Sequence, residues 1–136
     1  MGPFVRAYLR LMAALTALSC LGLLIIPAQL GALSSWGAAG WQREIALWNL
    51  AMYILIARTL RRRDPAAERL LAAALVVLNL LVAANHFATI VYGPIAPLNA
   101  IAGAVNAAAG TIGAIALWRT RDADAATKPP ASKGYA

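Results

Sequence analysis

Charge is nearly absent from long parts of this chain. From Leu70 to Trp118, forty-nine consecutive residues include no Asp, Glu, Lys or Arg, and only the turn sequence Gly93–Pro97 interrupts the run. This is the length of two bilayer-spanning helices joined by a tight turn. Two further uncharged runs, Leu11–Gln42 and Ile45–Ala57, complete a pattern of four spans. With 12% charged and 62% hydrophobic residues, an ordinary soluble domain, in which about a quarter of residues are charged, is excluded.

Residues that hold metals or link chains are also scarce. The only cysteine is Cys20 and the only histidine is His86, which excludes an intramolecular disulfide and a bis-histidine haem within one chain and disfavours a Cys/His metal site. The net charge of +7 does not indicate nucleic-acid binding, because the arginines lie at helix ends without interleaved aromatic residues. We therefore predict no metal ligands and no catalytic residues.

The pattern predicts an all-α integral membrane protein, a four-helix transmembrane bundle with up-down topology. One transmembrane domain is expected over residues 1–118 and a disordered cytoplasmic tail over 119–136. Asp64 and Pro65 are expected as N-cap and first residue of a helix. The segment Ala28–Trp41, rich in Gly, Ala and Ser, is expected as an interfacial loop or a short surface helix. The predicted helices cover about 8–26, 42–60, 65–92 and 97–118.

The basic residues predict how the helices are threaded. Eleven of the twelve Lys and Arg residues fall in the N-terminus, the loop between the second and third spans, and the tail, whereas the two opposite loops carry only Arg43. By the positive-inside rule both termini face the cytoplasm, in a bacterial-type plasma (inner) membrane. A basic start before an apolar stretch also describes a signal peptide, so cleavage after Pro27 is the alternative for the first helix.

Small and polar residues form one stripe on the last predicted helix. Steps of four, three, four and three residues place them on a single face. Glycines allow another helix backbone to approach, and asparagine amides in hydrocarbon need partners. We interpret the stripe as a packing seam, with a ligand-lining face as the alternative. Its members are Asn99, Gly103, Asn106, Gly110 and Gly113.

Two other predicted helices carry matching polar stripes. Gln42, Asn49 and Tyr53 share a face of the second helix, and Asn79 shares one with His86 on the third. Asn85 flanks His86, and Glu44 lies at the outer mouth of the second helix.

These residues are expected to converge into one buried network, with Asn49 and Asn99 as the nearest candidate partners of His86. An intramembrane ionisable group is by default a candidate functional site. His86 is therefore a structural core residue, a contact for a ligand such as a quinone, or a group for proton transfer or haem ligation.

The layout resembles the DoxX-like family of small bacterial membrane proteins. The resemblance covers about Gln42 to Trp118 and rests on four short spans, on Arg58 at the end of the second helix, and on the sequence Ala83-Ala84-Asn85-His86 in the third. It implies a four-helix bundle and a small accessory subunit in membrane redox systems or quinone-coupled oxidation. The chain differs from that pattern in Asn49 and Tyr53, where a glycine-rich segment is expected.

Two function classes follow. The first is an accessory or ligand-binding subunit that holds a quinone or other apolar ligand, beside the lipid bilayer and a larger membrane complex or a second copy of itself. The alternative is a small dimeric transporter. Four-helix multidrug transporters need a carboxylate in their first span, but the first helix here has none and Glu44 lies too near the mouth to replace it. A membrane enzyme would need His86 with Glu44 or Tyr53 as an acid/base pair.

Overall fold

The computed structural model describes residues 3–34, 37, 39–93 and 96–126, with side chains as far as residue 121. In this part of the chain the regular structure is entirely helical, and the predicted all-α class is confirmed. Five helices follow one another: α1 (Pro3–Ile25), α2 (Pro27–Leu33), α3 (Ala39–Arg62), α4 (Pro65–Tyr92) and α5 (Pro97–Ala126).

Three of the described helices are long and apolar enough to cross a membrane: α1, α4, and α5 over Pro97–Arg121. Large hydrophobic side chains are exposed along them, including Ile25 (73% exposed), Leu70 (75%) and Val91 (72%). Soluble monomers rarely expose extensive apolar surface, whereas lipid tails cover it at no cost. These helices support a multi-pass membrane protein.

Helix α3 is less apolar than the other long helices. Its uncharged part, Ile45–Ala57, lies between Glu44 and Arg58. Thirteen residues rise only about 20 Å at 1.5 Å each, against about 30 Å of hydrocarbon. By length and composition α3 is not among the candidate spans found in the described residues. The expected fourth span therefore depends on how α3 is packed.

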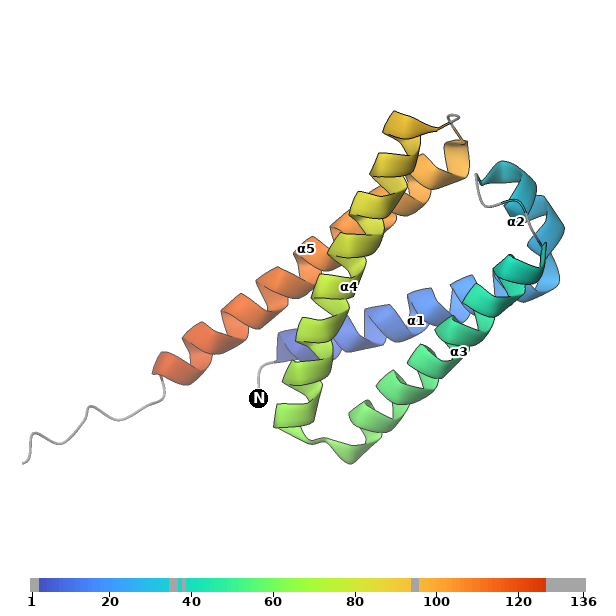
Figure 1. Ribbon diagram of the computed structural model, residues 1–136. Coiled ribbons are helices and arrows are strands. Elements are labelled where there is room, and N and C mark those ends of the chain that lie inside the picture. Colours follow the sequence, from blue (N-terminus) through green and yellow to red (C-terminus); the bar gives the residue numbers. More distant parts are fainter. Residues whose placement is uncertain (1–2, 35–36, 38, 94–95, 127–136) are drawn as a thin grey trace, which may run out of the picture.

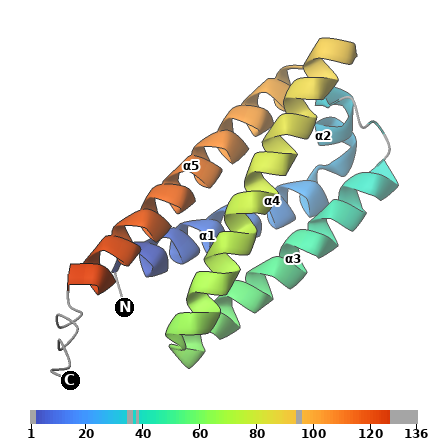
Figure 2. The same ribbon diagram turned by 60° about the vertical axis from the view of Figure 1, so that its left-hand side comes forward.

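The long helices form two antiparallel pairs that pack together through α1 (Figures 1 and 2). The α4–α5 pair has the most extensive contact, and α1 pairs with α3, to which the short α2 connects it. The starts of α1 and α4 lie at the same end of the molecule as the ends of α3 and α5 (Figures 1 and 2). We call this the basic end, because nine arginines belong to it: Arg6, Arg10, Arg58, Arg61, Arg62, Arg63, Arg69, Arg119 and Arg121.

The largest buried cluster joins α1, α3, α4 and α5 in the half of the molecule near the basic end. Tyr8 and Leu9 of α1 pack there with Ile56 of α3, Leu75 of α4 and Ala109 of α5. Buried apolar side chains of four different helices hold these helices in one unit. The opposite end has fewer large buried residues and contains most of the predicted polar ones.

The start of α4 agrees with the sequence prediction. Asp64 is the N-cap, and its Oδ1 accepts hydrogen bonds from the amides of Ala66 (2.9 Å) and Ala67 (3.4 Å). Pro65 is the first helical residue, where its missing N–H leaves no bond unmade. The N-cap prediction is confirmed, and the predicted range 65–92 coincides with α4.

Other helices are longer than predicted. Helix α1 begins at Pro3 instead of about 8, because proline is tolerated in a first turn. Helix α3 begins at Ala39 and takes in the expected end of the loop. Helix α5 continues to Ala126, so residues 119–126 are helical where a disordered tail was expected. They are mainly Ala, Arg and Asp, with no proline to stop the helix. Residues 127–136 lie outside the described part.

The expected interfacial loop contains α2, the short helix that was the alternative for this segment. Pro27 opens it, and the amide of Ser34 closes it by donating to the carbonyls of Leu30 (3.1 Å) and Gly31 (3.3 Å). Gln42 of α3 is buried, and its Nε2 donates a hydrogen bond to Ser34 Oγ at 3.3 Å. Helix α2 is thereby attached to the start of α3. Trp36, expected at the membrane boundary, lies outside the described residues.

Candidate functional site

His86 and Asn99 meet near the end opposite the basic end. His86 is buried on α4 (8% exposed), and Asn99 is fully buried in the first turn of α5. Their polar side chains interact across the two helices. The antiparallel packing of α4 on α5 makes this possible, because it sets the last turns of α4 beside the first turn of α5. Of the two partners expected for His86, the structure places Asn99 beside it.

Asn49, the other expected partner, is on the opposite helix pair. Its Nδ2 donates to Ser19 Oγ of α1 at 3.1 Å and so joins α3 to α1. Asn49 does not reach His86, because its helix, α3, packs mainly on α1 and only slightly on α4. The prediction that Asn49 reaches His86 is therefore wrong.

The two asparagines expected near the middle of the bundle bond mainly to their own helices. Asn79 Nδ2 donates to the carbonyl of Leu75 at 2.7 Å and lies 3.8 Å from Met12 Sδ. Asn106 Nδ2 donates to the carbonyl of Ala102 at 2.8 Å. Bonding to a carbonyl one turn earlier satisfies a donor in hydrocarbon without any partner helix. Asn79 and Asn106 therefore use these donors mainly on their own helices and not in bonds to His86.

Three predicted site residues face outward. Asn85 is exposed beside His86, because successive helix residues point about 100° apart. Tyr53 is 39% exposed on α3, and Glu44 is exposed in its first turns. These three residues are not part of a buried polar core, and Glu44 and Tyr53 do not form an acid/base pair with His86.

The predicted glycine stripe faces neighbouring helices. A Cβ added at Gly103 would lie 3.0 Å from a ring carbon of Phe87 and 3.2 Å from His86 Cβ. One at Gly110 would lie 2.7 Å from Leu80 Cδ2. One at Gly113 would lie 2.5 Å from both the Tyr8 ring and Val76 Cγ2. The α4–α5 backbones thus approach along this stripe, and at Gly113 helix α1 packs there too.

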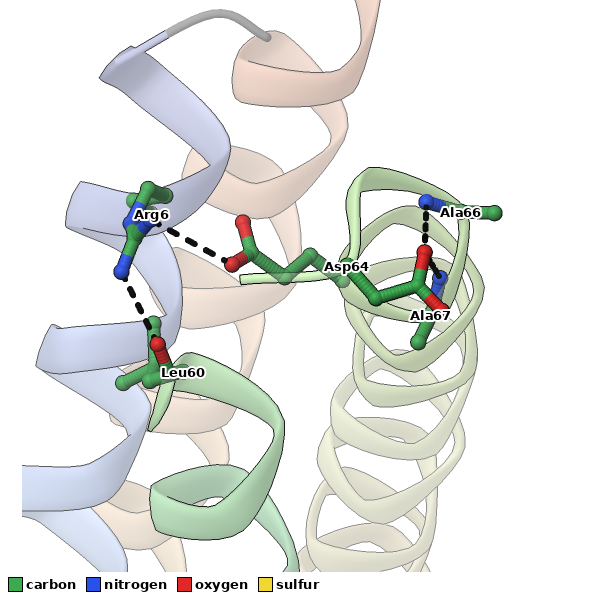
Figure 3. Close-up of polar contacts among 6 residues, drawn as sticks. Arg6, Leu60, Asp64, Ala66 and Ala67 are labelled. Carbon is green, nitrogen blue, oxygen red and sulfur yellow. Dashed lines mark hydrogen bonds and ion pairs between the residues drawn. The ribbon is translucent and has the colours of Figure 1, made fainter. Parts of the chain in front are cut away.

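A buried ion pair lies at the basic end, where the sequence analysis placed no site. Glu68 in the first turns of α4 is fully buried, and its Oε1 lies 3.6 Å from Arg6 Nη1. Arg6 Nη2 also donates to the carbonyl of Leu60 at 3.0 Å (Figure 3). One guanidinium therefore joins α1 to the end of α3 and the start of α4.

The burial of Glu68 could have been predicted from its helical spacing to Asn79 and His86, which share one face of α4. Stepping back from Asn79 by four, three and four residues gives Leu75, Ala72 and Glu68, and all three are buried. The local sequence pointed the other way, since Glu68 follows an arginine-rich loop and suits the positive end of a helix as a solvated charge. The helical period was the stronger signal.

An apolar groove lies between α1 and α5 near the basic end. Its volume is about 290 Å³. Positions spaced by three, one and three residues line it from each helix, so two single faces form its walls. At the polar end of the groove, Cζ of Arg119 lies 5.3 Å from the centre of the Phe4 ring. The lining residues are Phe4, Ala7, Tyr8, Leu11, Ile112, Ile115, Ala116 and Arg119.

These residues supply hydrogen bonds, one cation and apolar contacts. No group of three or more His, Cys, Asp or Glu side chains is placed to hold a metal ion within the described residues. His86 and Asn99 supply hydrogen bonds in an apolar surrounding, and Arg119 supplies a cation beside an apolar groove. Comparison with known proteins adds no family: no family model, curated protein or solved structure matches the chain.

Proposed function

We propose that this protein is a four-span membrane protein that binds an apolar ligand with a hydrogen-bonding head, such as a quinone, as an accessory subunit of a larger membrane complex. In this proposal the protein spans a bacterial-type plasma membrane, and both termini lie on the cytoplasmic side. The binding site is centred on His86 and Asn99. The resemblance to DoxX-like proteins agrees with this proposal and is not needed for it.

The packing of α3 supports the fourth span. Arg6 near the start of α1 bonds to Leu60 near the end of α3, and Ser19 further along α1 bonds to Asn49. Helix α3 therefore runs antiparallel to α1 through most of its length. A helix so paired crosses the same layer as its partner. The short apolar part of α3 is accommodated by arginines at its ends, whose long side chains reach the headgroups.

The buried His86–Asn99 pair is the observation that carries the ligand proposal. An imidazole in an apolar layer is expensive and is usually retained for a function. Phe87, 43% exposed, lies against Gly103 beside His86. A quinone ring entering from the bilayer would pack on Phe87 and accept or donate a hydrogen bond at His86 or Asn99.

The test uses the full chain purified in mild detergent and a short-chain ubiquinone as probe. We expect saturable binding, measured by the rise in melting temperature with ubiquinone concentration. Replacing His86 with Leu should weaken binding about tenfold, the loss of one hydrogen bond in an apolar site. His86→Gln should retain part of the affinity, because an amide also donates and accepts.

Asn85→Leu is the matched control, since Asn85 is adjacent in sequence but exposed. It should bind ubiquinone like the unmodified chain. Equal affinity in His86→Leu and Asn85→Leu would exclude His86 from the site. Absence of saturable binding to the unmodified chain would overturn the ligand proposal, and a larger membrane protein that purifies with the chain would support the accessory role.

The transporter alternative has one structural observation in its favour. Glu68 of α4 is a buried carboxylate beside α1, although α1 itself has no carboxylate. Arg6 lies 3.6 Å from it and already supplies the opposite charge, which leaves little attraction for a cationic substrate. Proton-driven uptake of a lipophilic cation dye into vesicles, lost in Glu68→Gln, would favour the transporter over the binding protein.

A further inference from the structure

The groove between α1 and α5 combines an apolar length with a cationic end. Phe4, Ala7 and Leu11 line it from α1, and Ile112 and Arg119 are among the residues that line it from α5. The two helices run antiparallel here, so Phe4 lies beside Arg119 at the basic end. Ile112 and Arg119 are seven positions apart on α5, a rise of about 10 Å. The groove thus extends from the basic end toward the middle of the membrane.

The walls and floor of the groove are built from different kinds of residue. Tyr8 and Ala116 are buried and form its floor, whereas Phe4, Leu11 and Ile112 are exposed at its sides. The small Ala116 side chain leaves the space that larger neighbours enclose. A hollow with apolar walls that opens to the bilayer accepts a flexible hydrocarbon chain without the loss of any hydrogen bond.

The polar end selects a negative charge. Arg119 Cζ lies over the Phe4 ring, 5.3 Å from its centre, which places the guanidinium and its fork of N–H donors at this end of the groove. A phosphate oxygen pair matches that fork. Nine arginines belong to the basic end, and acidic residues in the same segments are fewer. The surrounding charge at this end is positive.

We propose that the groove binds one anionic phospholipid of the cytoplasmic leaflet, with an acyl chain between α1 and α5 and the phosphate at Arg119. The arrangement of the groove matches that of a lipid, because the cation lies at the membrane surface, where the phosphate is, and the apolar part lies deeper, where the acyl chain is. The choice of the cytoplasmic leaflet rests on the proposed topology. The site itself lies at the basic end, apart from the His86 site, so either ligand proposal stands if the other fails.

A competition experiment tests the proposal. The full chain in detergent is mixed with equal amounts of phosphatidylglycerol and phosphatidylcholine of identical acyl chains, and native mass spectrometry counts the lipids retained. We expect one retained phosphatidylglycerol and a preference of about tenfold over phosphatidylcholine, the effect of one charge-assisted contact. Arg119→Gln should reduce the preference to about one.

Two further variants separate the site from general attraction to basic surfaces. Arg121→Gln removes a charge at the same end that does not line the groove, and it should keep the preference. Ala7→Leu fills the groove from an exposed position, so it should reduce retention of both lipids. Equal retention of the two lipids, an equal effect of Arg119→Gln and Arg121→Gln, or unchanged retention in Ala7→Leu would each overturn the proposal. Displacement of the lipid by millimolar inorganic phosphate would show a free-phosphate site instead.

Discussion

Arg6 lies 3.6 Å from the buried carboxylate of Glu68, and this pair connects the two helix hairpins of the molecule. The same guanidinium donates to the carbonyl of Leu60 at the end of α3. Helix α3 contacts α4 only slightly. Arg6 of α1 joins both of these helices through its side chain. A charge buried in an apolar core is stable only while its partner is present.

Removal of Arg6 alone should therefore destabilise the protein strongly. We expect Arg6→Leu to lower the free energy of unfolding by about 3 kcal/mol, because Glu68 is left buried without its counter-charge. Denaturant unfolding in detergent micelles measures this change. Arg10→Gln, which removes an exposed charge one helical turn away, should change stability by less than about 0.5 kcal/mol.

The double variant Arg6→Leu/Glu68→Leu distinguishes a paired charge from a general packing effect. It should be more stable than Arg6→Leu, since two apolar side chains replace the pair without leaving a charge behind. If the two single losses simply add in the double variant, Arg6 and Glu68 do not act as a pair.

The glycine stripe predicts a graded response to added methyl groups. Gly113→Ala should cost about 2 kcal/mol, because its Cβ would lie 2.5 Å from both Tyr8 and Val76, which are buried. Gly103→Ala should cost less, because Phe87 is partly exposed and can move away. Thermal unfolding in detergent ranks the variants, with exposed Ile112→Leu as a control near zero. Equal tolerance at both glycines would mean that the helices separate easily along the stripe.

Much of the helical layout follows from local signals that the sequence displays. Asp64 and Pro65 define the start of α4, and the long uncharged run defines α4 and α5. The end of α5 was harder to predict. Nothing in residues 119–126 marks the end of a helix, and only their polar character suggested that the helix stops at residue 118. Polarity marks where a helix leaves the membrane, which is not where it ends.

The partners of the polar residues were the less predictable part. Helical spacing places Asn49 and His86 on inward faces, but the pairing of helices decides which faces meet. Since α3 packs on α1, Asn49 bonds to Ser19. Spacing within one helix carries no information about which neighbour it has, so the inward faces of Asn49 and His86 were predicted correctly and the pairing of their helices was not.

Backbone strain at the turn between α3 and α4 gives a stabilising prediction. Arg63 has a φ of 54°, a left-handed conformation that costs a side-chain-bearing residue about 1 kcal/mol. Arg63→Gly should raise the free energy of unfolding by up to about 1 kcal/mol in detergent. Arg62→Gly removes the same charge from the last helical residue and should lower stability by about 0.5 to 1 kcal/mol. A loss of stability in both variants would show that the turn does not hold Arg63 in this conformation.

Topology can be tested at two exposed positions on either side of α3. In a Cys20→Ser background, Gly37→Cys and Ala66→Cys each place a thiol outside the packed core. If α3 crosses the membrane, an impermeant maleimide added to intact cells should label Gly37→Cys and leave Ala66→Cys unlabelled until the cells are opened. Labelling of both, or of neither, in intact cells would place the two ends of α3 on one side and leave three spans.

The last prediction concerns which asparagine supports His86. His86→Leu should lower the free energy of unfolding by about 1 to 2 kcal/mol, because fully buried Asn99 loses its partner across the helices. In a double-mutant cycle, His86→Leu should couple to Asn99→Leu by at least about 0.5 kcal/mol and to Asn49→Leu by nearly nothing. Asn49→Leu should couple instead to Ser19→Ala, because Asn49 donates to that hydroxyl at 3.1 Å. Coupling of His86 to Asn49 that equals its coupling to Asn99 would contradict the helix pairing and restore a single polar network. Independent behaviour of His86 and Asn99 would remove the pair on which the ligand proposal rests.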